Sequence, residues 1–371
     1  MRVSIKLESM SLVKRLGLTK QKTVIIIMVT VIIFSAILYW LLSRTEEIKL
    51  IFTYQPSTHH IAAFIILHNH WIEEEAAKLG YKLQINEECY GSGPPQMERF
   101  AAGAVDVAYV GAAPVINEVG WSLKKGYPKA VIVAAVNLQG SALVMRTDFE
   151  YTGPKSLKKA TIGTFPPGSI QDTILKDWLN KNGLSYGPPG TSGVDVFVRS
   201  ADPRELITLL NASLVDGIFV PSPSPEICEY KGIGKIVESS ANMIQNHPCC
   251  VLALRDSFIT EHRDLAEIIV KCHIRAEQFI HKNPEEAVNI AAEKLAELWK
   301  ESEEFVRTIV EKALIENPTG LVYCPDPHEI VEGVMYYVNV QWKLNYIPVK
   351  PTVDQLFDFS LYDNVYCNVG V

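Results

Sequence analysis

The sequence predicts an α/β protein of two lobes, with a helical C-terminal region and one N-terminal transmembrane helix. Three observations predict this class. The phrase that begins at Val105-Asp106 recurs at Val215-Asp216, each time after a helical run and before a loop of small residues. The chain after Arg255 keeps a helical spacing of apolar residues, and one uncharged run of 21 residues lies near the N-terminus. A repeated helix, buried strand and loop indicates two similar lobes; two Rossmann-like units without a shared ligand are the alternative.

The uncharged run, Thr23 to Ser43, would be about 32 Å long as a helix, which is enough to span a bilayer. Six basic residues and one acidic residue precede it: Arg2, Lys6, Lys14, Arg15, Lys20, Lys22 and Glu8. This bias predicts that residues 1–22 are cytoplasmic, that 23–43 anchor the chain in the cell membrane as a single pass, and that the rest is extracytoplasmic. A cleaved signal peptide is the alternative, but the run is longer than a usual signal core and no A-x-A-like site follows it.

The charge and the cysteines exclude several classes of function. After residue 44 the chain has 28 basic and 41 acidic residues, a net charge of −13, which repels nucleic acid. The seven cysteines show no C-x-x-C spacing, and we can assign no disulfide. A nucleophile motif such as G-x-S-x-G is missing from the sequence. We therefore expect no nucleic-acid partner and no enzymatic activity.

Residues 44–140 are expected to form the first part of lobe 1. Apolar periodicity and turn residues predict strands at 48–54, 81–86, 105–110 and 130–136, and helices at 61–79, at 96–102 and up to about 125. Gly80 fits a C-cap for the helix before it. Pro94 and Pro95 suit the start of a helix, where a missing N–H costs nothing.

Residues 141–246 are expected to form lobe 2, and 247–371 to complete lobe 1 and add the C-terminal helices. The predicted strands lie at 142–145, 160–164, 195–199, 215–220, 236–237 and 251–254, and the predicted helices at 170–181 and 203–210. The chain is expected to cross between lobes at 139–141 and to return at 246–250. Further helices are expected to start at Pro284 and Pro327, each behind a cap residue, and at a capping box on Thr352.

The loops that follow the buried strands are the candidate ligand site, because ligands bind outside the carboxyl ends of strands in open α/β sheets. Gly91-Ser92-Gly93 and Gly168-Ser169 open helices whose free N–H groups favour an anion. A plain N-cap is the alternative for Ser169. These loops contain no Lys or Arg, so His59 and His60 are their only side chains able to gain a positive charge.

Two further groups of residues have alternative interpretations. Tyr54, Tyr90 and Phe165 could wall a ligand, although aromatic residues at strand ends are more often core. Cys249-Cys250 after His247 could be a metal or redox cluster, but a pair of buried thiols is the simpler interpretation. We therefore expect no metal site and no cofactor.

The order of these motifs resembles the solute-binding proteins of nitrate, sulfonate, taurine and bicarbonate ABC importers over about residues 48–365. The motifs that carry the resemblance are Gly91-Ser92-Gly93, the stretch 102–111, the stretch 168–172 and Val215-Asp216. The resemblance implies a periplasmic-binding-protein-like (type II) clamshell. The loop at Pro221-Ser222 departs from the family, many of whose members have an acidic or aromatic residue beside a Pro there.

The family's ligand loops fall on the following residues of this chain: Tyr54, Gln55, His59, His60, Gly91, Ser92, Gly93, Gly111, Ala112, Ala113, Gln139, Gly140, Ser141, Gly168, Ser169, Ile170, Gln171, Pro221 and Ser222. The resemblance implies a membrane-anchored, extracytoplasmic protein that captures a small anionic or polar solute between its lobes. Its expected partners are that solute, an ABC permease with its cytoplasmic ATPase, and the membrane through the N-terminal helix. Binding or synthesis of a thiamine-pyrimidine precursor on the same fold, and a tethered sensor ectodomain, are the alternatives.

Overall fold

A computed structural model describes residues 20–42 and 46–369 of the 371-residue chain. These residues form two compact units. One consists of the described residues up to Glu47 together with Gly80–Lys82, and the other of Ile48–Leu79 and the described residues from Leu83 onward.

The first unit contains helix α2 (Lys20–Leu42) and the beginnings of β1 and β2. Its side chains from Val24 to Ser35 are exposed. Within the described ranges, no helix meets the combined requirement of length and apolarity for crossing a membrane. The run predicted as an anchor, 23–43, falls on α2 except for Ser43, which lies outside the described residues. Residues 1–19 of the predicted cytoplasmic segment lie outside the described residues.

The second unit contains two mixed β-sheets with helices around each, which we call lobe 1 and lobe 2. The lobe 1 sheet has the order β2-β1-β3-β12-β4. Its strands are β1 (Glu46–Tyr54), β2 (Tyr81–Cys89), β3 (Val107–Gly111), β4 (Ala130–Ala135) and β12 (Cys250–Arg255). Its helices are α3 (Ile61–His68), α4 (Trp71–Lys78), α5 (Gly93–Ala101), α6 (Ala112–Lys125), α11 (Asp256–Glu261) and α12 (Arg263–Lys282). Strand β3 runs parallel to β1 and antiparallel to β12.

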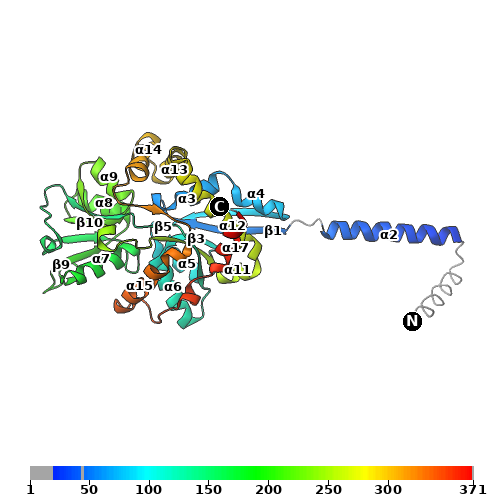
Figure 1. Ribbon diagram of the computed structural model, residues 1–371, viewed down its shortest axis with the longest axis horizontal. Helices are drawn as coiled ribbons and strands as arrows, with labels where there is room; N and C mark the ends of the chain where they lie inside the picture. The colour runs from blue at the N-terminus through cyan, green and yellow to red at the C-terminus, as the bar shows by residue number, and fades with distance from the viewer. Residues whose placement is uncertain (1–19, 43–45, 370–371) are drawn as a thin grey trace. The chain divides into compact units, whose positions relative to one another are not determined.

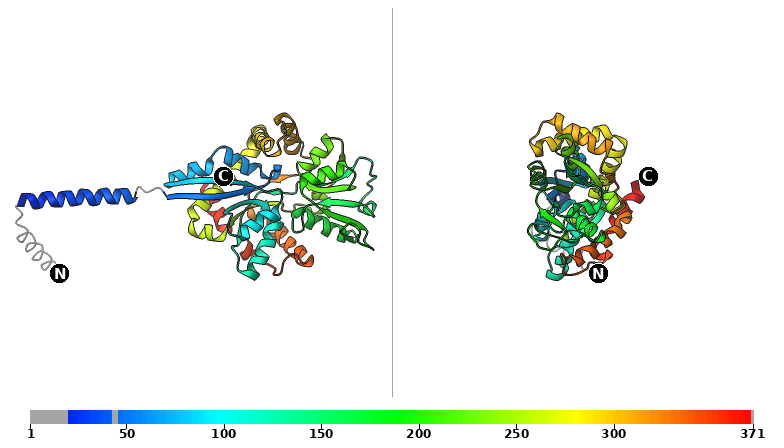
Figure 2. Two further views of the ribbon diagram at one scale, coloured as in Figure 1. Left: turned by 180° about the vertical axis from the view of Figure 1, so that it is seen from behind. Right: turned by 90° about the vertical axis from the view of Figure 1, so that its left-hand side faces the viewer.

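The lobe 2 sheet has the order β11-β6-β10-β7-β9-β8 and is drawn mainly in green in Figure 1. Its strands are β6 (Ser141–Arg146), β7 (Thr161–Thr164), β8 (Tyr186–Gly187), β9 (Val196–Ser200), β10 (Gly217–Pro221) and β11 (Gly234–Ser239). Its helices are α7 (Ile170–Lys181), α8 (Pro203–Asn211), α9 (Ser224–Tyr230) and α10 (Ser240–Met243). Figure 2 shows from behind that the two sheets are separate bodies joined by a few crossing segments.

The repeated Val-Asp phrase makes the same hydrogen bonds in both lobes. The Asp106 carboxylate accepts a hydrogen bond of 2.8 Å from Ile51 N–H within β1, and it pairs with Arg255. The Asp216 carboxylate accepts one of 2.8 Å from Thr161 N–H at the start of β7, with Arg146 at 3.7 Å. Each Asp thus ties its own strand to the parallel neighbour. The repeat in the sequence is a repeated strand pairing.

The two crossovers between the lobes run side by side. The outgoing one contains β5 (Asn137–Leu138), which pairs with β13 (Val322–Tyr323). Gln139 N–H donates to the His247 carbonyl on the returning one at 2.9 Å, and Cys249 N–H donates to the Asn137 carbonyl at 2.9 Å. The backbone of Gly140 has a positive φ of 82°, and a Cβ there would lie 2.7 Å from the His59 ring. Glycine is therefore required at this crossing.

The C-terminal helices cover both lobes. They are α13 (Pro284–Trp299), α14 (Glu303–Glu311), η3 (Lys312–Glu316), η4 (Pro327–Ile330), α15 (Val331–Lys343), α16 (Val353–Leu356) and α17 (Phe359–Val369). The capping box predicted on Thr352 is confirmed. Helix α15 packs against α6 of lobe 1 and α7 of lobe 2, so it spans the cleft between them.

Two predicted elements were wrong in detail. The single helix expected at 61–79 is two helices, because His70 adopts a left-handed backbone with φ of 54° that an α-helix cannot contain. Asn69 supports the break by donating its side-chain amide to the Ile65 carbonyl. The loop expected after β10 contains helix α9, which the run of Ser and Pro at 221–225 concealed.

Replacing Asp106 with Ala tests the repeated pairing. The change leaves the half-buried Ile51 N–H without its partner and Arg255 without its ion pair, so we expect the free energy of unfolding to fall by about 1–3 kcal/mol. Urea unfolding followed by circular dichroism measures it. Asp363→Ala, which removes an exposed pair with His328, is the control and should leave the unfolding midpoint nearly unchanged. Equal effects of both changes would contradict a structural role for Asp106.

Candidate functional site

The carboxyl ends of strands from both sheets open into one cleft. Its deep part is a cavity of about 20 Å³, roughly the room that one water molecule or ion needs. The residues around the deep cavity come from the loops after β1, β3, β7 and β10, the start of α5, and the return crossover: Gln55, Ser57, His59, His60, Gly93, Gly111, Pro114, Phe165, Ser169, Ile170, Gln171, Pro221, Cys249 and Cys250.

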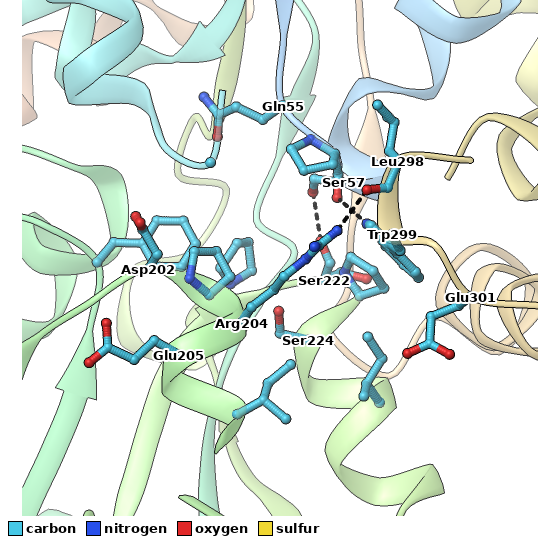
Figure 3. A pocket seen from close by; sticks show the side chains of 18 of the residues that line it. Gln55, Ser57, Asp202, Arg204, Glu205, Ser222, Ser224, Leu298, Trp299 and Glu301 are labelled. Carbon is cyan, nitrogen blue, oxygen red and sulfur yellow. Dashed lines mark hydrogen bonds between the residues drawn. The ribbon is translucent and has the colours of Figure 1, made fainter. Parts of the chain in front are cut away.

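The outer part of the cleft is a larger cavity of about 840 Å³, shown in Figure 3. It shares four lining residues with the deep cavity: Gln55, Ser57, Phe165 and Pro221. The two cavities are therefore successive parts of one cleft. Aromatic side chains from both lobes and from the C-terminal helices complete the outer walls: Tyr90, Trp299 and Phe305.

The structure brings together only part of the site predicted from the sequence. Nine of the predicted residues line the deep cavity: Gln55, His59, His60, Gly93, Gly111, Ser169, Ile170, Gln171 and Pro221. Gly91 and Ser222 line the outer cavity. Gly168 lies in a separate hollow beside Asn117. The others are buried behind these walls: Tyr54, Ser92, Ala112, Ala113, Gln139, Gly140 and Ser141.

Arg204 and Lys231 line the outer cavity, and sequence reasoning missed both of them. The search for cations covered only the loops, whereas Arg204 lies in the first turn of α8 and Lys231 just after α9. The guanidinium of Arg204 crosses the cavity and donates to the Leu298 carbonyl at 2.8 Å (Figure 3). Helix α8 starts soon after the carboxyl end of β9. Because ligands bind outside the carboxyl ends of strands in open α/β sheets, residues in the first turn of this helix, such as Arg204, are also candidates for the site.

Three predicted residues have structural roles. The Ser169 hydroxyl accepts a hydrogen bond of 3.2 Å from Asp172 N–H and caps α7, as the plainer alternative predicted. Tyr54 is buried, and its hydroxyl donates to Glu87. The Ser141 hydroxyl accepts a hydrogen bond of 3.0 Å from the Gln171 side chain. A hydrogen bond within lobe 2 therefore fixes the side chain of Gln171 in the wall of the deep cavity.

His59 is fixed at the crossing of the two lobes. Its Nε2 lies 2.9 Å from the Gly140 carbonyl and its Nδ1 lies 3.2 Å from Asn137 Oδ1. The Asn137 amide donates to the His59 carbonyl at 2.6 Å and accepts from Cys250 N–H at 3.1 Å. The loop after β1 and both crossovers therefore share one buried hydrogen-bond network.

The two histidines differ in charge. Burial, and then the charge of the neighbouring His59, lower the pKa of His60 to about 3, so His60 is neutral. Burial also acts to lower the pKa of His59, but the charge of Cys249 and the bonds to Cys249, Gly140 and Asn137 outweigh it and raise that pKa. Of the two rings expected to supply positive charge, only His59 can do so.

The loops of the two lobes touch at Ser222. Ser57 Oγ donates to the Ser222 carbonyl at 2.8 Å, and Thr58 Oγ1 donates to Ser222 Oγ at 3.0 Å. The Ser222 hydroxyl in turn donates to Glu226 at 3.0 Å. Burial raises the pKa of Glu226 to about 7. The contact between the lobes therefore rests on a buried acid that is protonated below neutral pH.

Tyr346 links the lobes at a second place. Its carbonyl accepts hydrogen bonds from Asn117 at 2.9 Å and Trp121 at 3.1 Å, both on α6 of lobe 1. Its hydroxyl donates to the Asp172 carboxylate on α7 of lobe 2 at 2.5 Å. Burial and then the Asp172 charge raise the pKa of the Tyr346 hydroxyl, which keeps it protonated as a donor.

Residues 44–296 of the chain match the NMT1-like family. Among curated relatives, the nitrate/nitrite binding protein NrtA of Nostoc is 23% identical over 180 residues, which cover 44% of this chain and 40% of that protein. The chain spans between 16% and 62% of the length of the first curated relatives it matches.

Two solved structures of similar fold are of binding proteins. The periplasmic nitrate-binding protein NrtA from Synechocystis has a TM-score of 0.69 and 15% identity, covering 88% of this chain and 90% of its own. The alkanesulfonate-binding protein SsuA from Xanthomonas axonopodis, bound to MOPS, has a TM-score of 0.68 and 14% identity, covering 85% and 100%. The α/β periplasmic-binding-protein-like fold, with mixed sheets, and the resemblance seen in the sequence are thereby confirmed.

The raised pKa of Glu226 predicts a pH dependence of stability. The folded pKa of about 7 exceeds the ordinary value of 4.5, so this contribution is complete below about pH 4.5 and is lost as pH rises through 7. At about 1.4 kcal/mol per unit, the loss is on the order of 3 kcal/mol. Burial raises the pKa of Glu118 to about 7 as well. Burial raises the pKa of Glu277 well above its ordinary value too. We therefore expect Glu226→Gln to remove about a third or less of the decline measured by urea unfolding between pH 4.5 and 8. An unchanged decline would contradict it.

Replacing Tyr346 with Phe tests the bridge between the lobes. The change removes the hydrogen bond to Asp172 but keeps the carbonyl contacts to α6, so the free protein should open. We expect a larger radius of gyration by small-angle X-ray scattering in Tyr346→Phe. Tyr366→Phe, on an exposed ring of α17, is the matched control. An unchanged radius in both variants would show that this bond does not hold the lobes together.

Proposed function

The chain belongs to the NMT1-like family, and from this premise we propose that it is the solute-binding component of an ABC importer. Its solute would be a small anionic or polar molecule of the nitrate, sulfonate, taurine or bicarbonate class. The observation that carries the proposal is the cleft between the lobes, whose walls are strand-end loops of both sheets. Such a site can be complete only when both lobes are present, as solute capture by closure requires.

The outer cavity suits a small charged or polar organic molecule, because it is lined by charged side chains of both signs: Arg204, Lys231, Asp202, Glu205 and Glu301. Its volume of about 840 Å³ lies within the usual range of about 300–1,000 Å³ for ligand pockets. Tyr90 and Trp299 supply apolar walls, and Gln55 and Ser222 supply polar groups. Arg204 gives the cavity a cation that could pair with a sulfonate or nitrate.

Contacts between the lobes explain how binding would be coupled to closure. The bonds of Ser57 to Ser222, of Arg204 to Leu298 and of Tyr346 to Asp172 each join parts that separate when the cleft opens. A solute held by both walls adds to these contacts and shifts the population toward the closed state. A permease that recognises this state would then receive the solute, with its cytoplasmic ATPase driving transport.

The location of the protein is part of the proposal. The related binding proteins of known fold are periplasmic, and we infer an extracytoplasmic place for the cleft. Anchoring through residues 23–43, with residues 1–22 in the cytoplasm, stays a prediction of the charge pattern around that run. The lobe boundaries at 140/141 and 246/247 likewise stay predictions.

The alternative functions make different predictions for the purified protein. A thiamine-pyrimidine enzyme should carry pyridoxal phosphate or iron, and the buried His59-Cys249-Cys250 cluster is the feature that would favour it. A tethered sensor should not associate with a permease. Co-purification of a permease and ATPase would favour the importer over both.

Arg204 provides the sharpest test of anion binding in the outer cavity. Binding of nitrate, methanesulfonate, taurine and bicarbonate to the purified protein would be measured by calorimetry. For the solute that binds, we expect Arg204→Gln to lower the affinity about tenfold, as loss of one charge-assisted contact predicts. The loss should shrink at high salt, because screening weakens the interaction in the native protein.

Arg199→Gln is the matched control, since it removes the same charge from lobe 2 on the neighbouring strand β9. Its affinity should equal that of the native protein. Equal losses in the two variants would show that net charge, rather than a contact in the cavity, attracts the solute. Failure of the whole panel to bind would contradict the proposed solute class.

A further inference from the structure

Three side chains able to bind a metal converge at the inner end of the cleft. A ring nitrogen of His59, Cys249 Sγ and Cys250 Sγ all lie within 4.8 Å of one another. The two sulfur atoms are 4.0 Å apart, and His59 Nδ1 is 4.0 Å from Cys250 Sγ. A tetrahedral zinc ion, with bonds of about 2.0–2.3 Å, separates its ligand atoms by about 3.5–3.8 Å. Movements of up to about one ångström would therefore form a site from these residues.

The hydrogen bonds of His59 leave one ring nitrogen for a cation. The Gly140 carbonyl can only accept, so Nε2 at 2.9 Å must carry a hydrogen. The opposite nitrogen, Nδ1, faces Asn137 Oδ1 at 3.2 Å. Cys250 N–H donates to this oxygen, which fixes it as the acceptor end of the amide. In the neutral ring, the lone pair of Nδ1 would then face a lone pair of Asn137 Oδ1, and the two would repel each other. A positively charged ion bound at Nδ1 removes this repulsion. A metal-binding histidine usually donates its other ring N–H to a carbonyl or carboxylate, as Nε2 of His59 does here.

We propose that His59, Cys249 and Cys250 form a binding site for a divalent cation that favours sulfur and nitrogen, with zinc as the representative ion. On binding, two protons leave to solvent, one from Cys250 and one from the His59–Cys249 pair, so that both sulfur atoms ligate as thiolates and the imidazole ligates in its neutral form. Two thiolates balance a divalent ion, so the buried group has no net charge.

The fourth coordination position of this ion would open into the deep cavity. All three ligand residues line that cavity, whose volume of about 20 Å³ has room for one water molecule or one ligand atom. Three protein ligands with an open position are typical of zinc sites that exchange their fourth ligand. This step rests on the proposed function: an anionic oxygen of the solute would take the open position. The described lining of the deep cavity includes no Lys or Arg that could bind the anion instead.

The proposal is tested on the purified full-length protein, reduced and stripped of metal by a chelator under nitrogen. Zinc is titrated against a chromophoric competitor, and Co²⁺ is titrated separately, since cobalt bound to thiolates gives a strong ultraviolet charge-transfer band. We expect one equivalent of zinc per chain and a thiolate band of matching stoichiometry. Zinc should also protect Cys249 and Cys250, but not the exposed Cys89 and Cys367, from iodoacetamide as read by mass spectrometry.

Variants show whether the assigned residues hold the ion. Cys249→Ser and Cys250→Ser should each weaken zinc binding at least 100-fold and reduce the cobalt band. Cys272→Ser, which alters another buried thiol outside the cleft, is the matched control and should bind zinc as the native protein does. If a variant fails to fold by circular dichroism, the zinc protection of native Cys249 and Cys250 decides the question. No zinc binding by the native protein, or zinc binding without protection of these two thiols, overturns the proposal.

Measuring solute binding with and without zinc separates this proposal from the proposed function. Zinc binding at the assigned thiols with no response to the anion panel would uphold the ion site and refute the anion-binding function. Anion binding by a protein that binds no zinc would uphold the function and refute the ion site. Anion affinity that rises at least tenfold on zinc loading supports both.

Discussion

The side chain of Asn137 holds together the three segments on which the cleft depends. Its amide donates to the His59 carbonyl in the loop after β1, and its oxygen accepts from Cys250 N–H on the return crossover. Asn137 itself belongs to the outgoing crossover and is fully buried. Removing this one side chain would leave several buried polar groups unpaired, each at a cost of about 1–3 kcal/mol. The two crossovers between the lobes, which we call the hinge, and the inner wall of the cleft therefore share the hydrogen bonds of this one amide.

The two lobes approach this hinge with the same construction. Asp106 and Asp216 each tie a central strand to its parallel neighbour, so both sheets direct the carboxyl ends of these strands toward the cleft. Polar loops and helix starts then gather there, since a buried parallel strand must end in a loop that satisfies its own backbone groups. Helix α15 and Tyr346 cross from one lobe to the other outside the sheets. The hinge and this second link together limit how the lobes can move.

Charge is distributed unevenly along the cleft. Arg204 and Lys231 lie in the outer cavity, where solvent reaches them. Deeper in, His60 is neutral and Glu226 is protonated below neutral pH, because burial disfavours their charged forms. A solute would thus first meet charges of both signs, because Asp202, Glu205 and Glu301 line the outer cavity beside the two cations. It would then meet an interior of hydroxyl, amide and thiol groups in which His59 can carry a positive charge.

The sequence by itself determined the elements and their repeat. Local signals placed helix α7 at 170–181 exactly as found in the structure, and they located the Thr352 capping box, because periodicity and caps depend on neighbours in the chain. They also located the loops that meet at the cleft. Only the tertiary structure decided which of those loop residues line a cavity, and it added Arg204 from a helix. It alone brought His59 to Cys250, 191 positions along the chain, because contacts so distant in sequence are set by how the two sheets and their crossovers pack.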